Sequence, residues 1–454
     1  MSERASVLVL AAGKGVRMRS ARPKVLHELC GLSMLEHVLA ALRAADLADV
    51  ALIVGAQLKE HVSALGLPAV VQEPQKGTGH AVRTALAALP RLRPVVLIVS
   101  ADMPLVTGEL LSAVVAAREQ ANAALALVTA RVQPPTDLGR ILRHDGHVIG
   151  IVENADATPE QRRIEEVNAG IYCFETAALR RQVGRLRPDN AQAELYLTDC
   201  VASLAREGAH VAAVEWQDAR EVQGVNNRSE LALARRTLQA RIAERHMLAG
   251  VNIVDPRNTY IDAQVQIGAD TTVLPHTHLL GTTRIGADCA LGPNATIVNA
   301  LIGDGVEITY SVVRDSQVAA GVSIGPFAHL RRGAVIETGA HIGNFVELKN
   351  TRMGARAKAG HLAYLGDAEL GERSNIGAGT ITCNFDGKRK HKTSIGKDAF
   401  IGSNSSLVAP LHVGAGSLTG AGSVVLRDVP DGERVAGNPA KPLSKKRGPS
   451  QEQS

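Results

Sequence analysis

The sequence predicts two domains of different class: an α/β domain with a mostly parallel sheet, then a parallel β-helix of hexapeptide repeats. Three observations lead to this prediction. Short apolar runs alternate with helical patterns over residues 6–227, and aliphatic residues recur at every sixth position from Ile267 onward. The stretch between them is rich in Ala, Leu, Arg, Gln and Glu, as in a linking helix. With 454 residues the chain is long enough for two domains, and we expect boundaries of 1–227, 228–248 and 249–454.

The front domain is predicted from its alternating pattern. Apolar runs at 7–12, 50–54, 95–100 and 124–129 are expected to be strands, and helical patterns at 34–45 and 81–89 lie between them. This alternation favours a parallel sheet with helices on both faces. In the linking helix, Ser229 is a candidate N-cap and Gly250 a stop signal.

The back domain is predicted from its period. Six residues fit neither the helical 3.6 nor the strand period of two, so the ladder is an internal repeat. Three six-residue strands make one triangular coil of about eighteen residues, with the aliphatic residues inside. Gly often follows the aliphatic residue, because a Cβ would obstruct the turn. The ladder runs through Ile267, Val273, Leu279, Ile285, Leu291 and Ile297, then Ile324, Leu330, Ile336, Ile342 and Leu348, then Ile395, Ile401, Leu407, Val413 and Thr419.

The last segment differs from the ladder. Beyond Val425 the hexads fade, and residues 427–454 contain four prolines, which predicts an irregular, partly disordered tail. A short basic cluster there, at Lys441 and 445–447, is typical of a solvated tail.

Composition excludes several classes of function. Aromatic residues make up 2% and the formal net charge is +5 with scattered basic residues, so a nucleic-acid partner is not expected. Five distant cysteines without C-x-x-C spacing indicate neither a disulfide framework nor a zinc site. No signal peptide or membrane-spanning stretch is apparent. We therefore expect a cytoplasmic protein without membrane insertion.

A candidate phosphate site lies after the first strand, which runs into Gly13-Lys14-Gly15 and then Pro23-Lys24. A Gly-rich turn between a strand and a helix exposes backbone N–H groups and the positive helix end, and Lys14, Arg17 and Lys24 add charge that suits a triphosphate. An ordinary turn between strand and helix explains the pattern equally well.

Two further segments support a ligand site. Residues 72–81 form a second Gly-rich loop that enters a helix, and the strand at 95–100 is followed by Asp102. A carboxylate at the carboxyl end of a parallel strand lies where α/β sheets bind ligands, and it could hold Mg²⁺. Alternatively, Asp102 only caps the following turn.

These motifs resemble the sugar-phosphate nucleotidyltransferases, whose signature is L-A-A-G-x-G-x-R-M with a downstream P-K. Residues 77–81, 139–141, 151–154, 168–171 and 224–228 and the hexad half extend the resemblance over nearly the whole chain, to the bifunctional N-acetylglucosamine-1-phosphate uridylyltransferases / glucosamine-1-phosphate acetyltransferases. The resemblance implies a Rossmann-like front domain and a left-handed β-helix. It also implies acetyl transfer from acetyl-CoA to glucosamine-1-phosphate, then uridylyl transfer from UTP to N-acetylglucosamine-1-phosphate.

The resemblance implies residue roles in the front domain. Val16 and Ala101 depart from the wider pattern, which often has Thr and Gly there. Asp102 and Asn226 would hold Mg²⁺, and Gly139, Glu153, Asn168 and Asn226 would contact the amino sugar. The nucleotide would contact Leu10, Ala11, Ala12, Gly13, Arg17, Lys24, Gln72, Gly77, Thr78, Ser100, Ala101, Asp102 and Asn226.

Polar residues gather in the β-helix between Ile324 and Ile395, where an insertion at 382–392 also breaks the ladder. Loops that leave a repeat array often carry binding surfaces. Histidine is the usual general base near neutral pH, although most lone histidines are structural.

The resemblance makes His361 the base of acetyl transfer, and Glu347 could orient it or neutralise the ammonium. Phe385 replaces a frequent Tyr, and Asn438 stands where some relatives have Arg. The sugar phosphate would contact Arg331, Lys349, Tyr364, Asn375 and Lys390, and acetyl-CoA would contact Ala378, Asn384, Phe385, Ser403, Ala421 and Asn438. The resemblance also implies a homotrimer with acetyl sites between subunits.

Two other interpretations stay open on the sequence. One is a monofunctional nucleotidyltransferase whose β-helix only trimerises. The other is a regulatory binding protein with a degenerate nucleotide site.

Overall fold

The computed structural model describes residues 5–443, and the chain divides into two compact units, Met1–Leu238 and Gln239–Ser454. The division falls inside helix α7 (Arg228–Leu248). No helix among residues 5–443 is both long and apolar enough to cross a bilayer.

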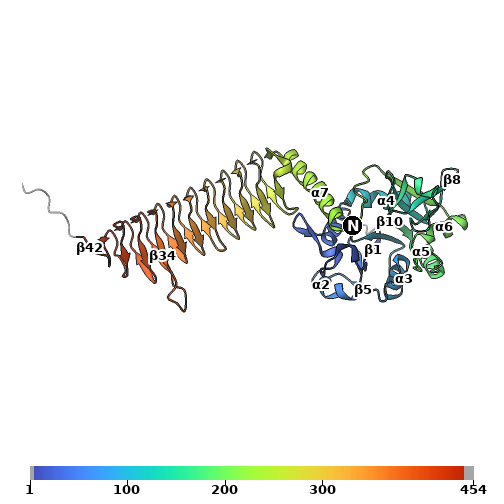
Figure 1. The fold of residues 1–454 in the computed structure, drawn as a ribbon, viewed down its shortest axis with the longest axis horizontal. Helices are drawn as coiled ribbons and strands as arrows, with labels where there is room; N and C mark the ends of the chain where they lie inside the picture. The colour runs from blue at the N-terminus through green and yellow to red at the C-terminus, as the bar shows by residue number, and fades with distance from the viewer. Residues whose placement is uncertain (1–4, 444–454) are drawn as a thin grey trace, which may run out of the picture. The chain divides into compact units, whose positions relative to one another are not determined.

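The first unit is an α/β domain built on a mixed sheet (Figure 1). Its strands are β1 (Ser6–Ala11), β4 (Val50–Val54), β5 (Ala69–Val71), β6 (Val95–Ser100), β7 (Leu125–Arg131), β8 (Arg140–His144), β9 (His147–Val152), β10 (Glu166–Glu175) and β11 (Val211–Trp216), with a small pair β2 (Glu28–Leu29) and β3 (Leu32–Ser33) beside it. Its helices are α1 (Met34–Ala44), α2 (Lys59–Ser63), α3 (Thr78–Ala88), α4 (Gly108–Gln120), α5 (Thr176–Arg185) and α6 (Asp199–Arg206).

The strand order of this sheet is β11-β7-β10-β6-β1-β4-β5. The predicted parallel pairing is confirmed for β1 with β4 and β6, for β4 with β5 and for β7 with β11. Strand β10 runs antiparallel to β6 and β7, and β8 and β9 form a hairpin beside it. The carboxyl ends of β1, β4 and β6 share one edge, where parallel sheets place ligands.

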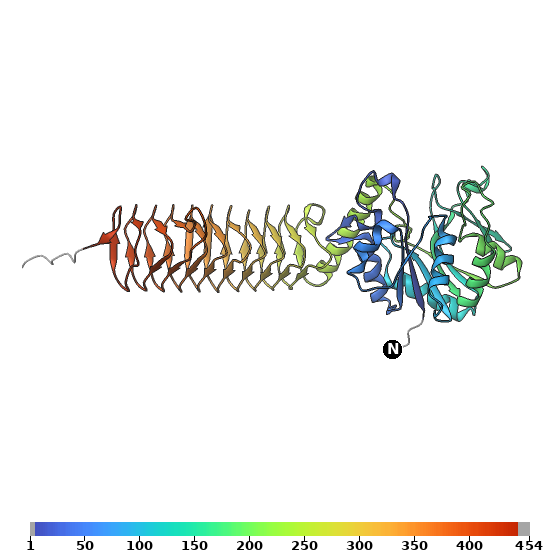
Figure 2. The same ribbon diagram turned by 90° about the horizontal axis from the view of Figure 1, so that it is seen from below.

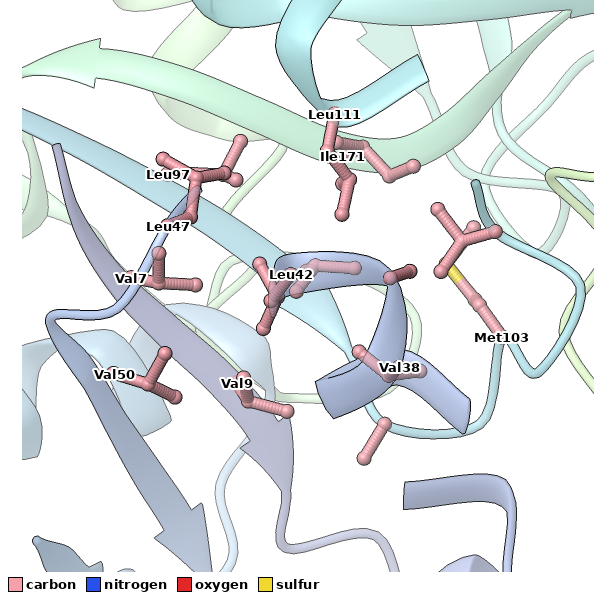
Figure 3. Packing of buried hydrophobic residues seen from close by; sticks show 14 of the residues in the cluster. Val7, Val9, Val38, Leu42, Leu47, Val50, Leu97, Met103, Leu111 and Ile171 are labelled. Atoms are coloured by element: carbon pink, nitrogen blue, oxygen red, sulfur yellow. The ribbon is translucent and has the colours of Figure 1, made fainter. Parts of the chain in front are cut away.

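Alternate residues of the central strands are buried on opposite faces of the sheet, because successive side chains of a strand point opposite ways. Val7 and Val9 of β1 pack with α1 and α4, whereas Leu8 packs with α3, α5 and α6. Figure 3 shows Val38 and Leu42 of α1 close to Val7 and Val9. Helix α1 begins after a capping box in which Ser33 and Glu36 satisfy each other's backbone N–H groups.

The second unit is a left-handed parallel β-helix of hexapeptide repeats, which confirms the predicted fold class. Figure 2 shows its strands stacked coil upon coil. In the described part of the chain they form three sheets. The first contains β12 (Asn252–Ile253), β15 (Thr272–Val273), β18 (Ala290–Leu291), β21 (Glu307–Ile308), β24 (Ser323–Ile324), β27 (His341–Asn344), β30 (Lys358–His361), β33 (Asn375–Ile376), β36 (Phe400–Ile401), β39 (Leu418–Thr419), β41 (Arg434–Ala436) and β42 (Lys441–Pro442).

The other two sheets form the remaining sides of the prism. The second contains β13 (Tyr260–Ile261), β16 (His278–Leu280), β19 (Thr296–Val298), β22 (Val312–Arg314), β25 (His329–Leu330), β28 (Glu347–Lys349), β31 (Tyr364–Gly366), β34 (Ile381–Cys383), β37 (Ser406–Val408) and β40 (Val424–Val425). The third contains β14 (Gln266–Ile267), β17 (Arg284–Ile285), β20 (Leu301–Ile302), β23 (Gln317–Val318), β26 (Val335–Ile336), β29 (Arg352–Met353), β32 (Ala368–Leu370), β35 (Thr393–Ile395) and β38 (Leu411–Val413).

The aliphatic ladder lies inside the prism, as predicted. Leu279 pairs with Ile297 one coil later, and both are fully buried. Within the predicted range 249–454, the β-helix begins before the first ladder residue, Ile267. Its first strands end at Ile253 and Ile261, whose spacing is not six. Between Leu291 and Ile324 some inward-facing residues are five positions apart instead of six, as from Ile297 to Ile302, and this spacing interrupts the ladder. A Cβ at Gly268 would lie 2.6 Å from the backbone of the next coil, which confirms the reason for glycine there.

Two irregular segments interrupt or end the prism. The predicted insertion leaves it as a loop between β34 and β35, visible in Figure 1. In the tail, the prediction of irregular structure was wrong for two segments: β41 pairs in parallel with β39, and β42 pairs antiparallel with β41. The buried Val435 side chain holds β41 in place there, although the sequence no longer follows the period of six. The rest of the predicted tail, 444–454, and with it most of the basic cluster, at 445–447, lies outside the described residues.

Candidate active sites

The Gly-rich turn after β1 leads into a shorter helix than the sequence predicts. Gly15 has a φ of 63°, and the next residues form a three-residue 3-10 helix, η1 (Val16–Met18), instead of an α-helix. So short a turn contributes little helix dipole. A Cβ at Gly15 would lie 2.6 Å from the Cβ of Lys24, so glycine lets Lys24 pack against the turn. Positive charge here therefore comes from side chains such as Lys14 and Lys24.

The second Gly-rich loop does enter a helix, because α3 begins at Thr78. The buried Gln72 side chain donates from Nε2 to the Gly77 carbonyl at 3.0 Å. A distant segment also holds the loop: the Gly79 N–H donates to the Leu195 carbonyl at 2.7 Å, and the Leu197 N–H donates to Thr78 Oγ1 at 3.2 Å. The amino end of α3 therefore lies at the carboxyl edge of the sheet beside the first turn.

Three predicted residues converge beyond the end of β6. The Lys24 ammonium lies 2.5 Å from Asp102 Oδ2 and donates to Asn226 Oδ1 at 2.7 Å. The Val225 N–H donates to the Asp102 carbonyl at 2.9 Å, which brings the residue 226 segment to β6. Glu230 accepts the Asn226 N–H at 2.7 Å. A carboxylate oxygen and an amide oxygen thus point at a single cation.

The predicted amino-sugar residues also converge. The register of β10 against β7 shifts between Asn168 and Tyr172, an irregularity of the kind that re-aims side chains next to active sites. The Asn168 N–H donates to the Gly139 carbonyl at 2.8 Å, and its side chain donates to the Tyr172 hydroxyl at 2.7 Å. Glu153 Oε1 accepts the Thr198 hydroxyl at 2.9 Å. Burial raises the pKa of Glu153, and the Thr198 hydrogen bond partly opposes that shift.

These groups line two cavities that share Ser100, Asp102, Glu153 and Asn168. The cavity of about 550 Å³ also contains Leu10 to Gly13, Lys24, Gln72, Gly77 and Thr78. The cavity of about 1200 Å³ also contains Gly139 and Asn226. Together they form one cleft at the carboxyl edge of the sheet, large enough for a nucleotide and a sugar.

Two predicted nucleotide contacts lie apart from this cleft. Ala101 is fully buried and donates its N–H to the Leu10 carbonyl at 2.9 Å, so it supports the strand end. Arg17 lies 3.6 Å from Asp137 and lines a neighbouring cavity of about 590 Å³ that also contains Thr78 and Glu153. Both remain predictions as ligand contacts.

In the β-helix, cations gather on the outer side of the second sheet. Arg331 donates to Glu347 Oε1 at 2.8 Å, and Glu347 pairs in register with Tyr364. Lys349 lies on the same strand as Glu347, and contact with Lys390 from the loop lowers the pKa of Lys349. Two ammonium groups and a guanidinium this close together are suited to a dianionic phosphate.

His361 is exposed at the end of β30, on the first sheet, and the next strand along the chain, β31, begins at Tyr364 on the second sheet. Asn375 lies in β33 on the first sheet, where it pairs with Lys358 and Phe400. The fold of one chain therefore places Asn375 on a different side of the prism from Arg331 and Lys349.

The predicted coenzyme residues occupy corresponding positions in successive coils. The Asn404 N–H donates to the Ala378 carbonyl at 2.7 Å, and the Gly422 N–H, next to Ala421, donates to the Ser403 carbonyl at 2.8 Å. Ala378, Ser403 and Ala421 therefore form a column along one corner. Small residues there leave the backbone accessible to a long ligand.

The remaining predicted coenzyme residues lie elsewhere. Asn384 is buried and donates to Asp367 Oδ2 at 2.6 Å, whereas Phe385 is exposed on the loop. Asn438 is exposed in the turn between β41 and β42. The loop itself is tied by Asp386, which accepts the N–H groups of Lys388 and Arg389, each at 2.8 Å.

Sequence reasoning missed the segment 190–199. Thr198, Glu194 and Tyr196 line the cleft or the cavity beside it, and Leu195 and Leu197 anchor the segment to the loop at α3. Nothing in its composition marks it as part of a site. Asp367, which holds both Asn350 and Asn384, was missed for the same reason.

Comparisons with known proteins match both halves of the chain. The model of the MobA-like NTP transferase domain matches residues 7–252, and that of the hexapeptide repeat of succinyl-transferase matches residues 392–427. "Bifunctional protein GlmU" of Trichlorobacter lovleyi is 48% identical over 431 residues, which cover 94% of each chain. The proteins of the same name from Pelobacter propionicus and Mycolicibacterium smegmatis are 46% and 44% identical, and cover 95% and 95% of this chain and 95% and 92% of their own.

This chain belongs to the bifunctional GlmU family. It is therefore a transferase that combines a nucleotidyltransferase domain with a hexapeptide-repeat acetyltransferase domain. Membership over both halves favours two activities, uridylyl transfer and acetyl transfer, over the monofunctional alternative.

Proposed function

We propose that the chain makes UDP-N-acetylglucosamine in two steps. The β-helix transfers an acetyl group from acetyl-CoA to glucosamine-1-phosphate, and the α/β unit then couples N-acetylglucosamine-1-phosphate to UTP with release of pyrophosphate. The observation that carries the second step is the convergence of Lys24, Asp102 and Asn226 at the cleft that also contains Glu153 and Asn168. We assign uridylyl transfer to residues 1–227, the link to 228–248 and acetyl transfer to 249–454.

In uridylyl transfer, a phosphate oxygen of the sugar phosphate attacks the α-phosphorus of UTP, and pyrophosphate leaves. No covalent enzyme intermediate is required, so the protein contributes positioning and charge neutralisation. The backbone at Leu10–Gly13 and the start of α3 hold the nucleotide, and Lys24 binds its phosphates. Gly139, Glu153 and Asn168 hold the sugar on the opposite wall, which directs its phosphate toward the nucleotide.

Asp102 and Asn226 are the residues that would hold Mg²⁺. The set fits this ion because both atoms are oxygens, which Mg²⁺ prefers, and both already face one cation. No cluster of three or more His, Cys, Asp or Glu suited to a metal occurs among residues 5–443, so phosphate oxygens and water would complete the coordination. When bound, the ion would neutralise charge on the phosphates.

In acetyl transfer, the amine of glucosamine-1-phosphate attacks the thioester carbon of acetyl-CoA. The new C–N bond forms as the C–S bond breaks. His361 takes the proton of the amine and passes it to the departing sulfur, so coenzyme A leaves as the thiol. Arg331, Lys349 and Lys390 bind the sugar phosphate, with Tyr364 and Asn375. The coenzyme lies along Ala378, Ser403 and Ala421 and reaches Asn384, Phe385 and Asn438.

We also propose a homotrimer, because the residues proposed for one acetyl site lie on different sides of the prism. Asn375 lies on a different side of the prism from the cationic group, so a second chain would complete the site. One corner also carries an exposed apolar column, and the rings of Phe327 and Phe345 in it stack at 5.3 Å. The column continues through Tyr310 and Leu362, which are 44% and 61% exposed. Exposed apolar columns of this kind favour association.

The trimer can be tested by light scattering during size-exclusion chromatography. We expect Phe327→Glu with Phe345→Glu to lower the molar mass to that of one chain and to reduce acetyl transfer. Ile149→Glu, at a 45% exposed site in the other unit, is the control. A trimer that survives the double substitution would contradict this assembly.

The two activities are tested by supplying glucosamine-1-phosphate, acetyl-CoA, UTP and Mg²⁺, and omitting each in turn. Asp102→Ala should abolish pyrophosphate release and leave thiol release from acetyl-CoA unchanged. His361→Ala should abolish thiol release from acetyl-CoA, and it should leave pyrophosphate release unchanged when N-acetylglucosamine-1-phosphate is supplied. Full acetyl transfer by His361→Ala would reject the role of that residue. Because UTP and acetyl-CoA are the co-substrates, we also propose that the enzyme acts in the cytoplasm.

A further inference from the structure

The Lys24 ammonium lies at the position where the two proposed metal ligands converge. It is 2.5 Å from Asp102 Oδ2 and 2.7 Å from Asn226 Oδ1. Only 11% of the Lys24 side chain and 20% of the Asp102 side chain are exposed, so water screens this pair weakly. The ammonium therefore acts as a bound cation, and it neutralises the only carboxylate of the proposed ligand pair.

Lys24 and a divalent ion cannot hold both oxygens together. A Mg²⁺ ion binds oxygens at about 2.0–2.1 Å, which would place it almost on the ammonium, and the two cations repel each other. Metal binding thus requires the ammonium to leave.

The remainder of the site is built to stay in place when Lys24 leaves. The backbone of Asp102 is bonded to Val225, and the backbone N–H of Asn226 is bonded to Glu230. These bonds fix the positions from which both oxygens project. The Lys24 side chain is a flexible stem, and it lines the same cavity as Gly13, Gly77 and Thr78, where the nucleotide phosphates are proposed to bind.

We propose that Lys24 is an internal counter-cation that couples the binding of divalent metal and nucleotide. Without ligands it occupies the metal's oxygens and weakens metal binding. A triphosphate draws the ammonium to itself and so frees Asp102 and Asn226 for the ion. Metal and nucleotide then each displace the same contact, and displacement by one favours binding of the other. This inference rests on the proposed Mg²⁺ site.

The test measures Mn²⁺ binding to the full-length protein without nucleotide, by electron paramagnetic resonance of the free ion. Removal of the competing ammonium in Lys24→Met should tighten Mn²⁺ binding, on the order of 5- to 150-fold as in typical couplings. Lys14→Met is the matched control, since Lys14 lines the same cavity and carries the same charge. It should change the affinity far less. Lys24→Ala provides a second variant, and retained acetyl transfer and an unchanged circular dichroism spectrum report correct folding.

A second measurement compares UTP affinity with and without Mg²⁺ in the wild-type protein and in Lys24→Met. Association of Mg²⁺ with free UTP is the same in both experiments, so it cancels when the two proteins are compared. A smaller change in UTP affinity on adding Mg²⁺ in the variant than in the wild-type protein supports the coupling. An equal effect in both proteins, or Mn²⁺ binding that is unchanged or weaker in both Lys24 variants, overturns it. Asp102→Asn separates the two proposals: if Mn²⁺ binding survives that substitution, the metal site itself is misplaced.

Discussion

Replacing Thr198 with Val removes the hydroxyl that donates to Glu153 Oε1 at 2.9 Å and keeps the size of the side chain. Glu153 lies in a half-buried position where desolvation raises its pKa and the Thr198 hydrogen bond lowers it. A hydrogen bond to a charged group contributes about 1.5–3 kcal/mol. If Glu153 binds the amino sugar as a carboxylate, loss of this bond should lower kcat/KM for N-acetylglucosamine-1-phosphate by roughly 10- to 150-fold at neutral pH.

The same substitution should change the pH dependence in one direction. Without the hydroxyl, the charged form of Glu153 loses a stabilising partner, so its pKa rises and the acid limb of kcat/KM moves to higher pH. Pyrophosphate release is measured across pH 5–9. Thr198→Ser keeps the hydroxyl and serves as the matched control, and thiol release from acetyl-CoA reports the integrity of the other unit. A Thr198→Val profile that coincides with the wild-type profile, or moves to lower pH, would refute the role of Glu153.

Three further predictions concern stability. Gly77→Ala should destabilise the first unit by about 1–3 kcal/mol in chemical denaturation and weaken UTP binding, because Gly77 has a φ of 92° and a Cβ would lie 2.7 Å from the Leu195 carbonyl oxygen. Gly66→Ala, at a φ of 66° and with open space around the added Cβ, should lower the stability less. Equal losses of stability in the two variants would contradict this reason. Burial lowers the pKa of His246 to about 4, so below the ordinary value of 6.5 the unfolded chain takes up a proton that the folded chain does not. Stability should therefore fall by roughly 2–3 kcal/mol as the pH drops from 6.5 to 4, and a His246→Gln variant that loses as much stability over that range in thermal unfolding would argue against it. Ile342→Ala, inside the prism, should lower the free energy of unfolding in urea by about 2–5 kcal/mol. Leu301→Ala, at a 49% exposed site, should lower it far less. Similar losses in the two variants would mean that the ladder does not form the core.

The class of each half was predictable from the sequence because it depends on local repetition. The period of six places Leu279 and Ile297 inside successive coils whatever the rest of the chain does. Likewise, alternating apolar runs predicted β1, β4, β6 and β7. Where repetition weakens, prediction failed: the short helix after Gly15 and the tail strand β41 depend on local packing and not on a period.

Only the tertiary structure decided how the candidate sites are assembled. Lys24 and Asn226 are 202 positions apart, and their contact depends on the path of the chain across the sheet edge. The same path brings Thr198 to Glu153. Side-chain type at the strand ends could be read from the sequence, since parallel strands deliver their carboxyl ends to one edge. Which cation faces Asp102, and on which side of the prism Asn375 lies, are set by long-range packing and register, which no single stretch of sequence encodes.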